Sequence, residues 1–250
     1  AVTPARAALA RLDPAVAFLG PAPARLGASL TGFEVMNRFS LDLVRRHFPQ
    51  LAQPLPGAGW TVLLEQSDNE GEAQATQRFE SLLEAALERG LITDAAVAAS
   101  LEQARTLWHL REAIPLAQSL EGLNIKHDIS VPISRIPAFV RATDEALVRA
   151  VPGVRLVDFG HLGDGNLHYN VQAPSGMDAQ RFLAEHEERV NGIVYDAVMA
   201  HGGSISAEHG IGALKRDELA RRKSPVALKL MRAIKQALDP HGRMNPGRVV

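Results

Sequence analysis

Apolar and polar residues follow two different periods along the chain, and these periods predict its strands and helices. Apolar, partly β-branched runs bounded by turn residues predict strands over 28–36, 59–65, 124–131, 154–161 and 167–173. Apolar residues at helical spacing predict helices over 37–47, 70–90, 94–111, 134–149, 177–200, 213–222 and 225–238. This order of elements, with one tight hairpin, predicts an α+β fold in which helices cover one face of an antiparallel or mixed sheet.

The chain divides into three segments of different character. Residues 1–27 are rich in Ala and Pro and begin without Met, so we expect an artificial start and a connector. Residues 28–212 hold the predicted sheet, and the halves 28–140 and 141–212 could be two related, ferredoxin-like subdomains. Residues 213–250 follow as C-terminal helices and a tail.

Composition narrows the classes of function. The chain has 27 basic and 28 acidic residues, so no net field favours nucleic acid or an anionic membrane surface. It has no cysteine, which excludes disulfides and thiolate metal sites and is compatible with a cytoplasmic location. Apolar runs stop well short of a membrane span, and no signal peptide is recognisable. Any metal must therefore bind His, carboxylate or carbonyl groups.

Two segments carry candidate chemistry. In the first, Gly163-Asp164-Gly165-Asn166 predicts a tight turn, and pairing of Leu162 with Leu167 would place His161 opposite His168 on one face, which Asn170 shares. Two such imidazoles can hold one divalent ion, although His pairs without metal also occur. Asp164 is more typical of a turn former than of a ligand.

The second segment, GGSISAEHGIG (202–212), holds Glu208 and His209 in a glycine-rich loop. Two His and one carboxylate would make a site with open positions, which suits catalytic zinc or iron. Taken alone, Glu208 could be an acid at a helix N-terminus and His209 a polar loop residue. The two segments together are more specific than either.

These segments resemble the C-terminal domain of FAD-linked oxidases in the vanillyl-alcohol-oxidase superfamily, in the branch of D-lactate, glycolate and D-2-hydroxyglutarate dehydrogenases. The resemblance spans nearly the whole chain and rests on FEVMNR (33–38), LWHLREAI (107–114), IKHDISVPISRI (125–136), GHLGDGNLHYNV (160–171), SAEHGIG (206–212) and ALDPHGRMNPGRVV (237–250). It implies metal ligation by His161, His168 and Glu208, with zinc first and iron or manganese as alternatives. It also implies that His209 is the catalytic base.

The resemblance further implies a substrate site and a cofactor. It places Arg111 and Lys126 beside substrate carboxylates, Asn170 beside polar substrate oxygens, and Asn245 near the flavin. Taken alone, Arg111 is typical of a solvated or ion-paired residue, Lys126 of an edge-strand residue and Asn245 of a turn former. Pro115 stands where the hydroxyglutarate enzymes have a hydroxyl residue, which weakens the case for a distal carboxylate site.

The implied function is oxidation of a small D-2-hydroxy acid to the 2-oxo acid, with the hydride passing to FAD and then to an unknown acceptor. The sequence has no glycine-rich loop for the FAD pyrophosphate, and the resemblance implies that FAD is held by an N-terminal domain, to which residues 1–27 would connect. A homodimer is compatible with the sequence. A hydrolase that activates water at the same metal ligands, or a non-catalytic domain, is the alternative.

Overall fold

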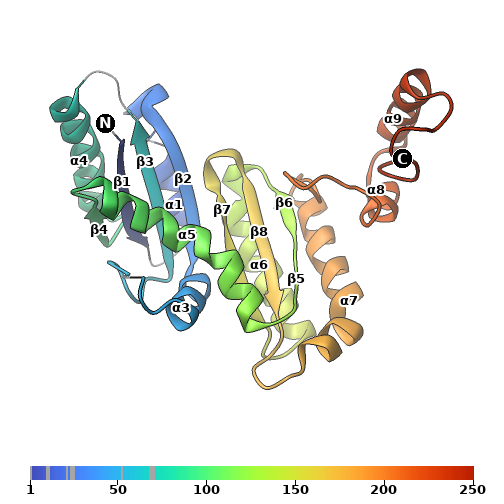
Figure 1. Cartoon of the computed structure of the whole chain (residues 1–250), viewed down its shortest axis with the longest axis horizontal. Helices are drawn as coiled ribbons and strands as arrows, with labels where there is room; N and C mark the ends of the chain where they lie inside the picture. The colour runs from blue at the N-terminus through green and yellow to red at the C-terminus, as the bar shows by residue number, and fades with distance from the viewer. Residues whose placement is uncertain (1, 10–11, 21, 23–25, 52, 68–70) are drawn as a thin grey trace.

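The computed structural model describes residues 2–9, 12–20, 22, 26–51, 53–67 and 71–250 (Figure 1). Within these residues, one antiparallel sheet runs in the order β4-β1-β3-β2-β7-β8-β5, and β6 pairs with β8. The predicted α+β class and the antiparallel sheet are confirmed. Pairing of β2 with β7 joins the two halves of the sheet edge to edge.

The N-terminal half supplies four strands. They are β1 (Val2–Leu9), β2 (Leu30–Asn37), β3 (Trp60–Ser67) and β4 (Asp94–Val97). The helices of this half are α1 (Leu12–Leu19), the 3-10 turn η1 (Gly27–Ser29), α3 (Arg38–His47) and α4 (Glu72–Glu88). Asn37 caps α3 by accepting a hydrogen bond from the Ser40 N–H (2.9 Å), and its amide donates to the Leu156 carbonyl. The cap therefore also ties α3 to the C-terminal half.

The C-terminal half carries the hairpin, and it begins before the expected boundary at residue 141, because β5 and β6 pair with β8. Its strands are β5 (Asn124–Ile125), β6 (Asp128–Ser130), β7 (Arg155–His161) and β8 (Asn166–Gln172). Its helices are α5 (Leu101–Glu121), η2 (Ile133–Arg135), α6 (Ile136–Ala150), η3 (Leu162–Asp164), α7 (Ala179–Ala200), α8 (Arg216–Arg222) and α9 (Pro225–Leu238). None of the described helices is long and apolar enough to cross a membrane.

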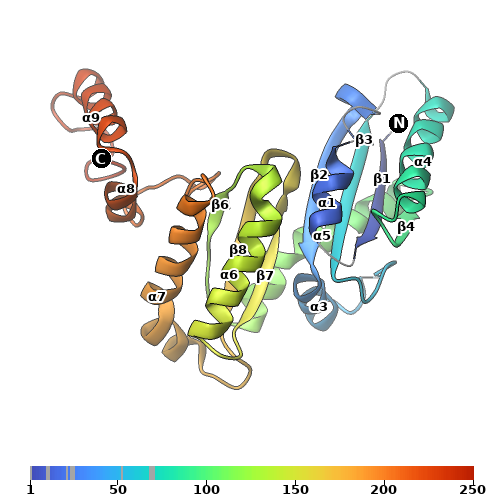
Figure 2. The ribbon, with the colours of Figure 1, turned by 180° about the vertical axis from the view of Figure 1, so that it is seen from behind.

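Helices cover both faces of the sheet, which corrects the expectation of one covered face. Helices α1, α4, α6 and α7 pack on one face and enclose the larger apolar cluster (Figure 2). Helices α3 and α5 cover the other face, and α5 crosses both halves of the sheet (Figure 1). The α5 face matters for function, because the polar residues of β7 and β8 described below point to it.

The helix predicted over 94–111 is wrong at both ends. Asp94–Val97 pairs with β1 as an edge strand, and α5 begins at Leu101 after the N-cap Ser100. The helix then continues past Arg111 and through Pro115 to Glu121. Packing of its buried residues against the sheet compensates for the backbone hydrogen bond that Pro115 cannot donate.

Helices α8 and α9 project away from the sheet and from the helices that cover it (Figure 1). Four apolar residues of α9, spaced four apart, are between 60% and 72% exposed: Val226, Leu230, Ile234 and Leu238. Such a stripe would be buried in an ordinary surface helix. This face of α9 therefore has no partner among the described residues.

Candidate active site

The β7–β8 hairpin holds its two histidines in a register different from the predicted one. Phe159, not His161, is opposite His168, so the predicted pairing of the two histidines is wrong by two residues. A shift of two leaves both rings on the α5 face but separates them along the strands by about 7 Å. Each histidine is instead opposite a carboxylate on a neighbouring strand, because Glu34 pairs with His161 and Asp128 with His168.

The turn between β7 and β8 causes this shift. Residues 162–164 form the 3-10 turn η3, and Gly165 follows with a φ of 81°. A Cβ at Gly165 would lie 2.5 Å from the Val131 carbonyl oxygen, so only glycine fits. Asp164 accepts a hydrogen bond from the Asn166 N–H (3.3 Å), as a turn former does.

Asp128 anchors the loop that carries Glu208 and His209. One oxygen of its buried carboxylate, Oδ2, accepts hydrogen bonds from the backbone N–H groups of Ala207 (3.1 Å), Glu208 (2.9 Å) and His209 (2.8 Å). Burial alone would raise the pKa of Asp128, but these donors, together with His209, hold it below its ordinary value. The other oxygen, Oδ1, has no hydrogen-bond partner among the described residues.

A backbone bridge fixes the start of the same loop. Ser130 and Ser204 exchange two hydrogen bonds, of 3.0 and 2.8 Å. Gly203 makes this approach possible, since a Cβ there would lie 2.2 Å from the Ser130 carbonyl oxygen. The loop is thus docked against β6 at two successive points.

Four side chains form a continuous stack across the α5 face. The Arg111 guanidinium lies over the Phe159 ring (4.7 Å), Phe159 lies against His168 (4.9 Å between centroids), and His168 stacks on His209 (5.8 Å). Burial and the charge of Arg111 lower the pKa of His168, which favours the neutral ring that metal binding requires.

Glu34 joins the two ends of the site. Its carboxylate is 2% exposed, and Oε2 accepts a hydrogen bond from Arg111 Nε (2.8 Å). Its other oxygen, Oε1, accepts from His161 Nδ1. The Nε2 atom of His161 then lies 3.4 Å from Glu208 Oε1.

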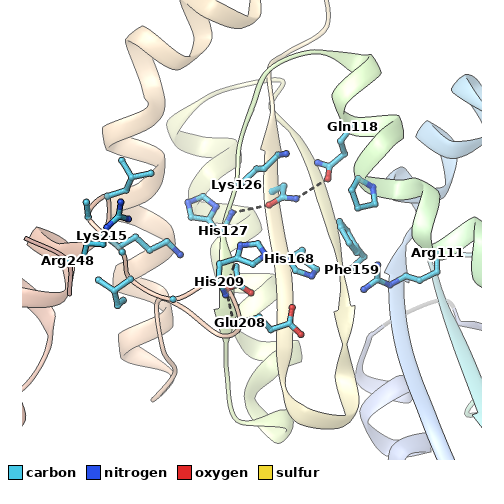
Figure 3. Close-up of a pocket in the computed structure, with 18 residues that line it drawn as sticks. Arg111, Gln118, Lys126, His127, Phe159, His168, Glu208, His209, Lys215 and Arg248 are labelled. Carbon is cyan, nitrogen blue, oxygen red and sulfur yellow. Dashed lines mark hydrogen bonds and ion pairs between the residues drawn. The ribbon is translucent and has the colours of Figure 1, made fainter. Parts of the chain in front are cut away.

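A cavity of about 610 Å³ contains most of the predicted site (Figure 3). Its lining includes the predicted residues Arg111, Lys126, Asn170, His168, Glu208 and His209. His161 lines a smaller neighbouring cavity of about 300 Å³ with Glu34. Asn245 lies in the exposed C-terminal tail, outside the lining of either cavity, with a φ of 48°.

Asn170 faces the cavity but is already engaged with the protein. Its Oδ1 accepts a hydrogen bond from the His127 N–H (3.0 Å), and its amide donates to Gln118 Oε1 (3.0 Å). The side chain therefore ties β8 to α5 and to the segment between β5 and β6. One amide hydrogen remains for a ligand.

The donor set fits a divalent ion. Among the described residues, ligand atoms of Asp128, His168 and His209 lie within 4.8 Å of one another. Of the three predicted ligands, only His168 belongs to this group, while His161 and Glu208 form a separate pair with His161 Nε2 3.4 Å from Glu208 Oε1. Neutral imidazole and carboxylate are ligands of zinc, iron and manganese, and the unpartnered Asp128 Oδ1 is a buried acceptor that an ion would satisfy.

The interpretation of the sequence assigned no role to Glu34, Asp128 or Phe159. The signal for the two acids was present, because each interrupts an apolar strand, in GFEVM and HDISV, where a charge is rarely tolerated without a partner. For Phe159 no such signal exists, since an aromatic residue in a strand usually belongs to the core.

Comparison with known proteins identifies the family. Residues 2–249 match the family of FAD linked oxidases, C-terminal domain. The chain belongs to this family. It is similar to the mitochondrial D-2-hydroxyglutarate dehydrogenase of Arabidopsis thaliana (34% identical over 229 residues) and to the D-2-hydroxyglutarate dehydrogenase of Stutzerimonas stutzeri strain A1501 (40% over 183 residues).

The FAD-linked oxidase resemblance inferred from the motifs is thereby confirmed. The matches cover 90% and 72% of this chain but only 39% of each relative, so the chain spans about two fifths of their length. A solved structure of p-cresol methylhydroxylase with substrate bound aligns with a TM-score of 0.66 at 13% identity, covering 100% of this chain and 52% of that one. This second likeness supports the fold.

Proposed function

We propose that this chain forms the substrate-binding part of an FAD-linked dehydrogenase that oxidises a D-2-hydroxy acid to the 2-oxo acid. The observation that carries the proposal is one cavity lined by the cations Arg111 and Lys126, by the imidazole of His168 with the carboxylates of Asp128 and Glu208, and by His209. A hydroxy acid presents a carboxylate and a hydroxyl on adjacent carbons, and this cavity offers a partner for each.

Arg111 would bind the substrate carboxylate. Its Nε is held by Glu34 and its guanidinium plane by Phe159, while its terminal nitrogens make no hydrogen bond to the described residues. A guanidinium fixed in this way can donate to both oxygens of a carboxylate with little loss of side-chain entropy. Lys126, exposed at the cavity, would add a second positive charge.

His209 would take the proton of the substrate hydroxyl. Its ring stacks on His168 and lines the cavity, and the Asp128 carboxylate lies 3.9 Å from its Nδ1. That carboxylate stabilises the imidazolium that forms on proton transfer. Asp128 also accepts the His209 backbone N–H, so it would both position the base and stabilise the positive charge that its ring acquires.

Two groups absent from this chain complete the chemistry. A divalent ion, proposed on His161, His168 and Glu208 with Asp128 alongside, would supply Lewis acidity that lowers the pKa of the substrate hydroxyl. FAD would supply the two-electron acceptor. The ion's identity, with zinc first, is part of this proposal.

The exposed face of α9 supports a partner domain. The matches cover only 39% of each named relative, and the family is defined as the C-terminal domain of FAD linked oxidases. An FAD-binding domain packed on α9 would cover Val226, Leu230, Ile234 and Leu238, and would bring Asn245 in the adjacent tail toward the flavin. A homodimer, the electron acceptor and the cellular compartment stay predictions; the name of the Arabidopsis relative includes "mitochondrial".

The charge of the cavity favours a dicarboxylate substrate of the 2-hydroxyglutarate type. Arg111 lies on one side, while Lys215 and Arg248 lie on the other (Figure 3). A second carboxylate could therefore be bound without the hydroxyl residue that Pro115 replaces. Both named relatives are D-2-hydroxyglutarate dehydrogenases.

Metal content and ligand binding of the purified chain test the proposal. Elemental analysis of the wild type should give close to one equivalent of metal, and His168→Ala and Glu208→Ala should both lose it. Calorimetry should then show that D-2-hydroxyglutarate binds the metal-loaded chain more tightly than D-lactate and that Arg111→Met weakens both. Metal that is retained in both alanine variants would refute the proposed ligands.

Dependence on FAD separates the dehydrogenase from a hydrolase built on the same donors. The FAD-bound protein should bleach when D-2-hydroxyglutarate is added without oxygen, because the substrate reduces the flavin. A hydrolase would leave the flavin spectrum unchanged and would release product from an ester or amide instead.

A further inference from the structure

Glu34 is a buried acid that the roles proposed above assign neither to the ion nor to the substrate. It is on β2, in the N-terminal half of the sheet, whereas the metal donors come from the C-terminal half. An isolated buried carboxylate is strongly destabilising, so its retention at 2% exposure requires partners for both oxygens.

Each oxygen of Glu34 has a different partner at a different part of the site. Oε2 accepts from Arg111 Nε at 2.8 Å, and Oε1 accepts from His161 Nδ1. Arg111 comes from α5 and His161 from the end of β7, beyond the last residue that pairs with β8. Without Glu34, His161 would lose its hydrogen-bonded partner on the neighbouring strand.

We propose that Glu34 is a positioning residue that sets the orientation of the carboxylate-binding Arg111 and the tautomer of the metal-binding His161 at the same time. This inference rests on the roles proposed above for those two residues. In a neutral ring, a hydrogen bond from Nδ1 to a carboxylate leaves the lone pair on Nε2, so a cation could be bound between Nε2 and Glu208 Oε1, which lie 3.4 Å apart. A ligating histidine generally needs such a partner, and loss of the partner lowers metal affinity by about 10- to 100-fold.

The same carboxylate determines which nitrogens of Arg111 reach the substrate. Because Nε is engaged and the plane lies on Phe159, the two terminal nitrogens are left for the cavity. The Glu34 side chain thus couples substrate binding by Arg111 to metal binding by His161, although these two partners lie 50 residues apart in sequence.

Glu65 offers a matched control. It lies on the neighbouring strand β3, and its carboxylate accepts from Trp108 Nε1 (2.5 Å) on α5 and from Thr31 Oγ1 (2.9 Å). Trp108 precedes Arg111 by about one helical turn. Glu65→Gln therefore removes a carboxylate link between the sheet and α5 without touching Arg111 or His161.

The first readout needs neither metal nor flavin. Two-dimensional ¹⁵N spectra of the metal-free chain, with ring signals assigned by His161→Gln, report the tautomer of His161. The wild type and Glu65→Gln should show the Nδ1–H form, whereas Glu34→Gln should show a shift toward the Nε2–H form. The Arg111 Nε–H signal should be protected from solvent exchange in the wild type and lost in Glu34→Gln.

The second readout measures binding. Glu34→Gln should weaken zinc binding by about 10- to 100-fold. It should also weaken D-2-hydroxyglutarate binding by about tenfold, as expected for the loss of a charge-assisted hydrogen bond. Glu65→Gln should leave both constants within about twofold of wild type. If Glu34→Gln does not fold, Glu34→Asp keeps the charge but cannot span both partners, and should shift the same signals in the same direction.

The outcomes separate this inference from the proposed function. Wild type that binds zinc and hydroxy acid, together with a Glu34→Gln variant that binds both equally well, would overturn the role of Glu34 and leave the function standing. A changed His161 tautomer in a chain that binds neither ligand would support the positioning role and refute the proposed function. Equal effects of Glu34→Gln and Glu65→Gln would reduce Glu34 to general support of the fold and overturn the inference.

Discussion

Asp144 is expected to make the folded chain less stable as the pH rises. Its carboxylate, on α6, accepts a hydrogen bond from the Tyr169 hydroxyl, and burial raises its pKa from 3.8 to about 6. Asp158, opposite Tyr169 across the hairpin, is fully buried, and neither of its carboxylate oxygens has a partner among the described residues. Burial, with the charge of Asp144, raises the pKa of Asp158 well above its ordinary value.

The sign of the effect follows from where the protons are held. Between pH 4 and 6 the unfolded chain has lost the Asp144 proton while the folded chain keeps it, so rising pH favours unfolding. The stability is fully present below pH 3.8 and is lost as the pH passes about 6. A rise of about two pKa units corresponds to about 3 kcal/mol of unfolding free energy.

Urea unfolding followed by circular dichroism at pH 4, 5, 6 and 7 measures this loss. Asp144→Asn should reduce the decline in unfolding free energy by at least about 3 kcal/mol. The reduction should exceed this value because the substitution also removes the charge that raises the pKa of Asp158. Asp13→Asn is the control, since Asp13 on α1 forms an exposed ion pair with Arg141, which is on α6 like Asp144. This substitution should change stability by less than about 1 kcal/mol. Parallel pH profiles for the wild type and Asp144→Asn would refute the assignment.

Three further substitutions test the loop and the junction of α3, α5 and β7. Gly203→Ala places a Cβ 2.2 Å from the Ser130 carbonyl oxygen, so we expect a loss of about 1 to 3 kcal/mol in thermal unfolding and reduced metal content. Asp128→Asn should cost about 1 to 3 kcal/mol and increase hydrogen exchange at residues 207–209, because its amide cannot accept three N–H groups equally well. Glu121→Gln should cost about 1 to 2 kcal/mol at pH 7. Burial would raise the pKa of Glu121, but hydrogen bonds with His47, Arg155 and Arg46 outweigh it and lower this pKa to about 2. The difference is therefore fully present above pH 4.5 and should vanish as the pH falls toward 2.

Local patterns predicted most of the elements that hold the site. The helix expected over 134–149 is α6, and the strands expected over 154–161 and 167–173 are β7 and β8 within about one residue at each end. These segments carry their own periodicity, so neighbouring elements only reinforce them. Arg111 and His209 were placed in the site by the resemblance of their motifs, whereas contacts of the loop with Asp128 and Ser130 bring His209 to the cavity.

The edge strand Asp94–Val97 shows where local pattern fails. Its four residues read as the start of a helix, because Asp94 resembles an N-cap and Ala follows. In the structure they pair with β1, whose residues come from the opposite end of the N-terminal half. Strand formation here depends on a distant partner rather than on the segment itself, which propensity cannot reveal.

The register of the β7–β8 hairpin decides which residues face each histidine, and it was the feature of the site hardest to predict from the sequence. Both the predicted and the observed pairing place His161 and His168 on one face, since they differ by two residues and the pleat repeats every two. Hydrophobic patterning, which distinguishes faces, therefore cannot choose between them. The choice is made by the turn at Gly165 and by two acids, Glu34 and Asp128, each opposite one histidine. A buried acid in a strand should accordingly be interpreted as a constraint on the register of a neighbouring histidine, and that constraint would have placed Glu34 in the site from the sequence alone.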